Sequence, residues 1–373
     1  MTGSRTARRV LAGGAAVAAA GWALRDVAAE LGARPLREDG PRAARIRRSP
    51  QFADGVFRNP MPGETRVPSG PPPRFFRELL TGREGRRPSG PVPLAAPRLG
   101  GPAADGLAVV WFGHASTLVE IEGRRVLFDP VWSTRVSPTR LVGPRRLHPV
   151  PVALAALPRV DAVVISHDHY DHLDLATVRA LTRAQQAPFL VPLGIGAHLS
   201  RWGVPGDRVI ELDWEEEAEV AGLRFTATAA RHFSGRSFSR NDTLWGSWAV
   251  AGPNRRVFYA GDSGYFDGYA RIGADHGPFD LTLMPVGAYS PAWPDIHMDP
   301  EEAVEAHVRL GGELMLPVHW ATFTLALHPW GEPVDRLWRE AKARDVRVVV
   351  PRPGDRVDAG APPAVDGWWE TLA

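Results

Sequence analysis

One stretch of the sequence, VVISHDHYDHLD from Val163 to Asp174, limits most strongly what the chain can fold into. It places three histidines and three aspartates within eight residues, directly after an apolar run typical of a buried strand. Burying so many imidazoles and carboxylates costs on the order of several kcal/mol unless something compensates, and a divalent cation can do so. The stretch therefore predicts a metal site. The alternative is a polar loop whose histidines only cap the next helix.

Four side chains of this stretch are candidate ligands in the order H-x-H-x-D-H, namely His167, His169, Asp171 and His172. Side chains two positions apart on an extended backbone point the same way, so His167 and His169 can converge on one point. Asp171 and His172 come after the chain turns and can serve a second point a few ångströms away.

Further candidates stand where other predicted strands end. His232 follows LRFTATAAR, Asp262 follows RVFYAG, and His319 ends ELMLPVH. Alone, each is more often an ordinary loop or core residue than a ligand. With the His-rich stretch they give five histidines and two aspartates, enough for two metal ions. Because the chain has no cysteine, any metal is held by nitrogen and oxygen, which suits Zn²⁺, with Mn²⁺ or Fe as alternatives.

The order of predicted elements indicates the fold class. Regular structure starts after Gly106, where LAVVWFGHASTLVEIEGRRVLFDP is typical of strand, turn and strand, with the bend at Glu122 and Gly123. Asp174 is placed to cap a helix. Later in the chain the helix candidates are fewer than the strand candidates and fall between them. Many strands without regular βα alternation favour an α/β sandwich, in which two mixed sheets are covered by helices.

The N-terminal residues have features of a targeting segment. Arg5, Arg8 and Arg9 precede a mildly apolar run of fifteen residues at 10–24, which is short for the roughly 20 residues of a bilayer span. Three alternatives stay open: a cleaved export signal, an uncleaved membrane anchor, and an Ala-rich helix without a targeting role. The protein is accordingly expected to be exported or membrane-associated, with a cytoplasmic location as the alternative.

Composition divides the chain into a signal-like or membrane-anchor segment at 1–35, an arm or linker at 36–105, a globular domain at 106–357 and a C-terminal tail at 358–373. Pro and Gly between residues 59 and 105 exclude a continuous helix or central strand there. The docking side chains expected in the arm are Phe75, Phe76, Leu79 and Leu80. Residues 1–100 carry 18 Arg against 8 acidic residues, but arginine content alone indicates no nucleic-acid partner.

Several blocks between Ala108 and Phe323 resemble a known family: WFGHAS, LFDPVWS, SHDHYDH, LWGSWAV, YAGDSGYF, FDLTLMPVGAY, HMDPEEAVEAH and PVHWATF. They are similar to the metallo-β-lactamase fold superfamily, and more narrowly to its N-acylphosphatidylethanolamine-hydrolysing phospholipase D branch. The resemblance implies an αββα sandwich of two mixed sheets and makes 106–357 the hydrolase domain. The first hundred residues show no such blocks.

The resemblance also implies a role for each candidate ligand. One zinc ion would be held by His167, His169 and His232, and the other by Asp171, His172 and His319. Asp262 would bridge the two ions. These residue types are all present here, so the site shows no departure from the family pattern.

A third candidate catalytic residue, beside Asp171 and Asp262, is His297. It precedes a strong helix start, with Asp299 as N-cap and Pro300 at the first helical position. In the resembling family the matching histidine lies by the active site, where it would bind phosphate or assist the leaving group.

The roles of other polar residues have more than one interpretation. Asp129 ends RVLFDP and either accepts an imidazole N–H, thereby orienting a ligand, or is only a turn residue before proline. His114 in WFGHAS either faces the site or fills its loop. His307 and His328 are expected to be structural or surface residues.

Three functions remain open at the level of sequence. The first is zinc-dependent, phospholipase D-like hydrolysis of N-acylphosphatidylethanolamine or a related phospholipid by a water that two metal ions activate. The second keeps the site but acts on a soluble lactone or cyclic phosphodiester, and the third is a non-catalytic metal-stabilised binding protein. Expected partners are a phospholipid or small phosphodiester and a membrane surface that attracts the basic arm, with a homodimer left open.

Overall fold

The computed structural model describes residues 27–31, 35, 40–61, 85–101, 103, 105–139, 141–236 and 240–373. The features expected of a targeting segment and the docking side chains expected in the arm lie outside these residues. They are Arg5, Arg8, Arg9, the apolar run at 10–24, Phe75, Phe76, Leu79 and Leu80. Within the described part of the chain, no helix is both long enough and apolar enough to cross a membrane.

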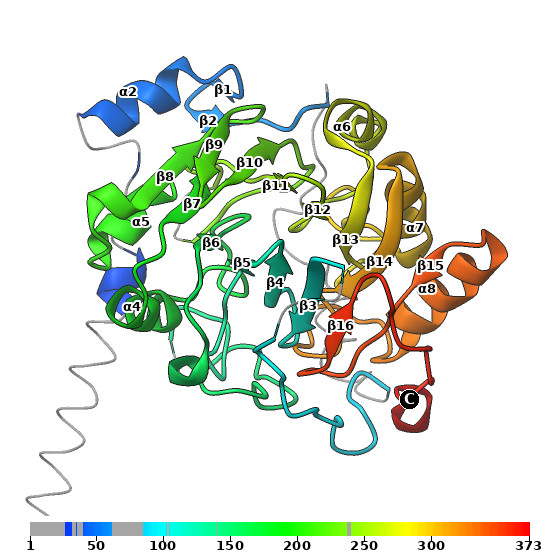
Figure 1. Cartoon of the computed structure of the whole chain (residues 1–373). Helices are drawn as coiled ribbons and strands as arrows, with labels where there is room; N and C mark the ends of the chain where they lie inside the picture. The colour runs from blue at the N-terminus through cyan, green and yellow to red at the C-terminus, as the bar shows by residue number, and fades with distance from the viewer. Residues whose placement is uncertain are drawn as a thin grey trace, which may run out of the picture.

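Two mixed seven-stranded sheets form the body of the molecule. Their strands are labelled in Figure 1. The first sheet has the order β16-β3-β4-β5-β6-β7-β8. Its strands are β3 Leu107–Trp111, β4 Thr117–Ile121, β5 Arg124–Phe128, β6 Ala162–Val164, β7 Phe189–Pro192, β8 Val209–Leu212 and β16 Arg356–Asp358. The second sheet has the order β15-β14-β13-β12-β11-β10-β9. Its strands are β9 Glu217–Val220, β10 Leu223–Thr228, β11 Ser247–Ala251, β12 Arg256–Tyr259, β13 Phe279–Pro285, β14 Gly312–Val318 and β15 Arg347–Val348.

Strand direction brings several strand ends to one edge in each sheet. In the first sheet β3 and β5 are both antiparallel to β4, and β5 is parallel to β6, so β3, β5 and β6 run the same way. In the second sheet β10, β12 and β14 share a direction for the same reason. Loops that follow these strands therefore lie together, which is where rigid sheets usually carry site residues.

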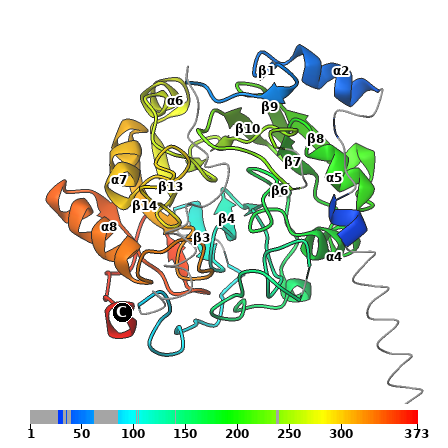
Figure 2. The ribbon, with the colours of Figure 1, turned by 180° about the vertical axis from the view of Figure 1, so that it is seen from behind.

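Helices cover the outer face of each sheet (Figures 1 and 2). The first sheet is flanked by α4 Leu175–Ala184 and α5 Gly196–Arg201. The second is flanked by α6 Gly268–His276, α7 Pro300–Arg309 and α8 Glu332–Ala343. Short 3-10 turns are η1 Leu154–Ala156, η2 Gly206–Arg208 and η3 Glu370–Leu372. The predicted sandwich of two mixed sheets flanked by helices is confirmed.

Alternating side chains explain why the first sheet is covered on both faces. In β5, Val126 and Phe128 belong to the core between the sheets, whereas Leu127 belongs to the core beneath α4. In β6, Val164 and Val163 divide in the same way. Successive side chains of a strand point to opposite faces, so runs that are apolar at every position need a partner on each side.

The predicted helix caps and hairpin bend are present. Asp174 accepts a hydrogen bond from the Ala176 N–H at the start of α4. Asp299 and Glu302 form a capping box at the start of α7, with Pro300 as its first residue. Glu122 joins β4 to β5 in the left-handed conformation, with φ of 49°. These local signals are strong because each satisfies backbone groups or the geometry of a turn.

Two parts of the chain outside 106–357 pack on this body. Within 36–105, expected as an arm or linker, the chain forms α2 Pro41–Arg48 and the hairpin of β1 Phe52–Ala53 and β2 Val56–Phe57. Ile46 and Phe57 are buried in one apolar cluster with Trp245. Within 358–373, expected as a tail, Trp368 and Trp369 are buried. The apolar contacts of the domain thus extend beyond both expected boundaries.

Candidate metal centre

The predicted ligand residues all lie in loops that directly follow strands. His167, His169, Asp171 and His172 follow β6, His232 follows β10, Asp262 follows β12 and His319 follows β14. Because these strands run toward the same edge of their sheets, residues 152 positions apart in sequence, His167 and His319, reach one site. The structure brings all seven predicted residues together there.

Three imidazoles and one carboxylate form the first cluster, which consists of His167, His169, His232 and Asp262. The His169 Nδ1 atom lies 2.9 Å from His167 Nε2 and 3.3 Å from His232 Nε2. Asp262 Oδ2 lies 3.7 Å from His167 Nε2 and 3.8 Å from His232 Nε2. Three imidazole nitrogens and one carboxylate oxygen are a donor set that would fit a divalent metal ion such as Zn²⁺.

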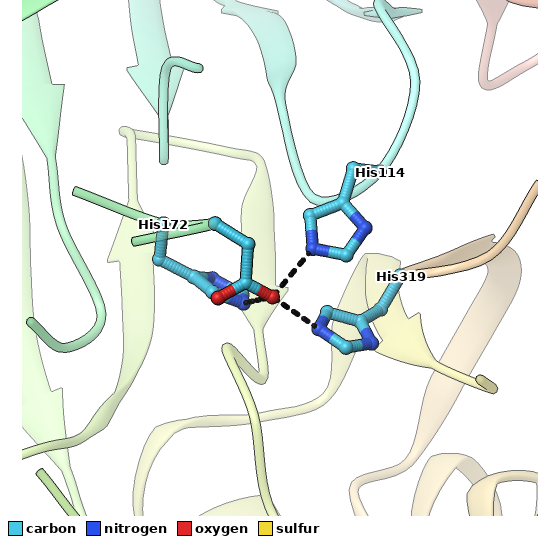
Figure 3. Close-up of side chains that lie close together, drawn as sticks. His114, His172 and His319 are labelled. Carbon is cyan, nitrogen blue, oxygen red and sulfur yellow. Dashed lines mark hydrogen bonds and ion pairs between the residues drawn. The ribbon is translucent and has the colours of Figure 1, made fainter. Parts of the chain in front are cut away.

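The second cluster consists of His114, Asp171, His172 and His319, and Figure 3 shows its three imidazoles turned toward one carboxylate. Asp171 Oδ2 lies 2.9 Å from His114 Nε2, 3.3 Å from His319 Nε2 and 3.5 Å from His172 Nε2. Of the two readings of His114, the structure therefore favours the one in which it faces the site. His114 is a candidate ligand that the family resemblance did not assign.

Asp262 lies between the two clusters. Besides its contacts in the first cluster, its Oδ2 atom is 3.2 Å from the Nε2 atoms of both His172 and His319 in the second. Gly261 precedes it with φ of 59°, and a Cβ atom at that glycine would lie 2.5 Å from the Ser166 side chain. A glycine is thus needed for the loop of Asp262 to approach the loop of His167 this closely.

Buried carboxylates make the centre favourable for positive charge. Burial opposes ionisation of Asp262, but His172 and His319 outweigh it and hold the pKa of this carboxyl well below its usual range. Burial also opposes charge on His319, yet Asp262 and Asp171 raise its pKa to about 9. A divalent cation supplies the same positive charge.

Donor atoms without partners support the fit to metal ions. Among the described residues, His172 Nε2 and Asp262 Oδ1 are buried and make no hydrogen bond. Buried polar atoms are normally hydrogen-bonded, so such atoms at one point need another partner. The two clusters, with their imidazole and carboxylate donors, are candidate metal-binding sites.

Asp129 connects the first sheet to the second cluster. Its Oδ2 atom accepts hydrogen bonds from His172 Nδ1 at 2.6 Å, from the Tyr259 hydroxyl at 2.5 Å and from the Ser166 hydroxyl. Its Oδ1 atom accepts from the Ser166 N–H at 2.8 Å. The bond to Nδ1 leaves His172 Nε2 free to face the cluster, so the structure favours the orienting role among the two readings of Asp129.

His297 lies at the edge of the site, before α7. Its Nδ1 atom is 4.0 Å from Asp262 Oδ2 and makes no hydrogen bond to a described residue. Burial lowers its pKa to about 4, so the imidazole is neutral at neutral pH. The same side chain lines a pocket of about 600 Å³ together with Tyr289, Leu327 and Arg336.

Of the two histidines expected to be structural or surface residues, His307 is buried and hydrogen-bonded to the Thr282 hydroxyl at 2.8 Å. His328 instead lines the pocket beside His297, where its ring is stacked on Tyr289 at 4.6 Å between centroids. No local sequence signal distinguished His328 from a surface histidine. Its place depends on the fold of the loops around α7 and α8.

Comparison with known proteins shows the family. Residues 124–320 match the Beta-lactamase superfamily domain. A protein of Mycobacterium tuberculosis is 54% identical over 98% of this chain and 99% of its own length. The Caenorhabditis elegans N-acyl-phosphatidylethanolamine-hydrolyzing phospholipase D 1 is 40% identical over 64% of this chain and 71% of the worm protein. The chain belongs to the metallo-β-lactamase superfamily.

Solved structures are similar to this chain in fold. A metallo hydrolase from the archaeon Ignicoccus hospitalis aligns with a TM-score of 0.52 and 25% identity, over 67% of this chain and 97% of that one. An isothiocyanate hydrolase from Delia radicum gut bacteria aligns with a TM-score of 0.53 at 18% identity, over 69% of this chain and 100% of that one, which shows the fold alone. The chain is a metal-dependent hydrolase of the metallo-β-lactamase fold.

The contacts of Asp129 lead to a prediction about metal affinity. Replacing Asp129 by Asn puts an amide N–H₂ among three donors and weakens the bond that orients His172. We expect affinity for Zn²⁺ to fall about 10- to 100-fold, measured by competition with a chelating dye. Asp161→Asn is the control, because Asp161 accepts only the Arg125 N–H among the contacts described, away from the site. Equal affinity in Asp129→Asn and the control would contradict the orienting role.

Proposed function

We propose that the protein is a phosphodiesterase of the phospholipase D type that hydrolyses N-acylphosphatidylethanolamine or a related phospholipid and uses two zinc ions. The observation that carries the proposal is the position of Asp262 between two clusters of imidazole and carboxylate donors. Similarity to the worm enzyme supports the lipid substrate. A mitochondrial N-acyl-phosphatidylethanolamine-hydrolyzing phospholipase D of Saccharomyces cerevisiae, 33% identical over 61% of this chain and 50% of its own length, supports it further.

Each of the two ions would be held by its own set of residues. His167, His169 and His232 would hold one ion, and Asp171, His172 and His319 the other, with Asp262 shared and His114 an additional donor. Two such ions supply a water activated at neutral pH and positive charge opposite the phosphoryl oxygens. The chain needs no serine or cysteine nucleophile for this chemistry.

Orientation of these donors comes from hydrogen bonds on the far side of their rings. His232 Nδ1 donates to the Ile296 carbonyl at 2.8 Å, and His172 Nδ1 donates to Asp129. Each bond fixes the tautomer, so the Nε2 lone pair faces the cluster. Both partner residues are buried, so the donors are oriented before any ligand arrives.

The pocket beside His297 is the proposed place for the leaving alcohol. Its wall combines apolar Tyr289, Pro291 and Leu327 with polar groups, as small-molecule sites commonly do. His297 lies between Asp262 and this pocket, so its imidazole can donate a hydrogen bond to the oxygen that leaves. A neutral imidazole has one N–H for this purpose and needs no change of charge.

The proposal is tested by hydrolysis of vesicles that contain N-acylphosphatidylethanolamine, with products separated by mass spectrometry. We expect N-acylethanolamine and phosphatidate from the zinc-loaded protein, loss of activity after chelation, and recovery when Zn²⁺ is added back. Lactones and cyclic nucleotides serve as soluble comparison substrates. Hydrolysis of the soluble compounds alone, or lipid hydrolysis that survives chelation, would contradict the proposed function.

His297 gives a second test of this site. We expect His297→Ala to lower kcat on the lipid by about 10²-fold, because the leaving oxygen loses a positioned hydrogen-bond donor. Metal content, measured by atomic emission, should stay at the wild-type level. His276→Ala is the control, since His276 pairs with the exposed Glu215 at 3.1 Å on the far end of α6. Unchanged kcat and KM in His297→Ala would remove His297 from the reaction.

A further inference from the structure

We call residues 167–172 the metal loop. Two of its residues that are not candidate ligands, Asp168 and Tyr170, are held by hydrogen bonds to one short segment, Gly235 and Arg236. The Asp168 carbonyl accepts a hydrogen bond from Arg236 Nη1 at 2.7 Å, and Asp168 Oδ1 accepts from the Gly235 N–H at 2.9 Å. Tyr170 donates its hydroxyl to the Arg236 carbonyl. The position of the metal loop therefore depends on Arg236.

Arg236 is itself almost completely buried, with 3% of the residue exposed. Its guanidinium lies 4.3 Å from the centre of the Tyr170 ring and 4.8 Å from that of Trp202. A guanidinium over aromatic rings is favourable, but the rings do not cancel its charge. A buried charge of this kind needs a counter-charge, because removal from water is otherwise strongly unfavourable.

The counter-charge comes from the N-terminal segment. Glu30 Oε2 accepts hydrogen bonds from Arg236 Nε at 2.8 Å and from Nη2 at 2.6 Å. Among the described residues, Glu30 is the only carboxylate within ion-pair distance of Arg236. The Glu30 residue is 7% exposed, so solvent screens the pair little.

Backbone contacts fix the same segment to α5 and the loop after it. Trp202 Nε1 donates to the Ala29 carbonyl at 3.2 Å, and Arg201 Nη2 donates to the Ala28 carbonyl at 2.9 Å. Trp202 thus contacts both the segment and the guanidinium. Residues 27–31 are helical and occupy one defined place on the domain.

We propose that Glu30 is a positioning residue for the metal centre, acting through Arg236 on Asp168 and Tyr170 of the metal loop. Without the carboxylate, the guanidinium must turn toward other acceptors or water, and it then releases the Asp168 carbonyl. The loop that carries His167, His169, Asp171 and His172 loses its support on one side. The inference rests on the proposed function in so far as this loop binds metal.

The pair also sets a condition on processing of the N-terminus. Cleavage on the C-terminal side of Glu30 would remove the counter-charge and leave Arg236 buried without it. A processed protein with an intact metal centre must therefore keep Glu30. This condition holds whichever role the residues before it have.

The experiment compares Glu30→Gln with Glu120→Gln in the full chain. Glu120 is a matched control, because it is likewise buried, with 5% of the residue exposed, and forms ion pairs at 3.6 Å with Arg125 and Arg356. It lies on β4 of the first sheet, far from the metal loop. Zn²⁺ affinity is measured by competition with a chelating dye, and ligand geometry by the visible spectrum of the Co²⁺-substituted protein. Thermal unfolding is recorded for each variant.

We expect Glu30→Gln to lower Zn²⁺ affinity by about 10- to 100-fold and to shift the Co²⁺ bands, whereas Glu120→Gln keeps the affinity and spectrum of the wild type even if its Tm falls. In an Arg236→Met background, Glu30→Gln should add no further loss. Tyr170→Phe, which removes one hydroxyl, should lower affinity in the same direction and serves if Glu30→Gln does not fold. Wild-type affinity in Glu30→Gln, or in Tyr170→Phe where the former cannot be made, overturns this inference alone. Failure of the wild type to bind metal removes the proposed function as well.

Discussion

The charge of two carboxylates, Asp171 and Asp262, is the constraint on which the rest of the structure depends. Both lie among imidazoles at the edge of the sheets, and Asp262 is only 3% exposed. Burial alone would raise the pKa of each carboxyl, yet the imidazoles keep both pKa values well below their usual range. The site is therefore built to concentrate positive charge at two neighbouring points. In a hydrolase of this superfamily, metal ions are the natural source of that charge.

Loops from both sheets supply the donors of this site. Strands β6 and β12 belong to different sheets, and the loops after them carry His167 and Asp262 to a separation of 3.7 Å between Nε2 and Oδ2. The Tyr259 hydroxyl crosses from the second sheet to Asp129 of the first, which ties the two halves together beneath the donors. The ring of Trp320, the residue after His319, lies 5.6 Å from that of Trp368 between centroids. Donors from distant parts of the chain thus share one rigid frame.

Local patterns in the sequence predicted the strands, the caps and the convergence of the donors, because each depends on neighbours in the chain. A strand run followed by His or Asp places that side chain at a sheet edge wherever the sheet lies. For Asp129 and His114 two interpretations stayed open, because a linear pattern does not tell which way the side chain of a turn residue faces. Glu30 and Arg236, 206 positions apart, have no local signal, and neither have Trp368 and Trp369, whose contacts exist only in the folded domain. Which metal binds stays a prediction.

The most direct test of the account is anomalous diffraction at the zinc edge from crystals of the zinc-loaded protein. The account predicts two peaks, roughly 3.5 to 4 Å apart, on either side of Asp262. One peak should lie among His167, His169 and His232, and the other among Asp171, His172 and His319. A single peak, or peaks away from Asp262, would contradict the claim that the two clusters form one centre.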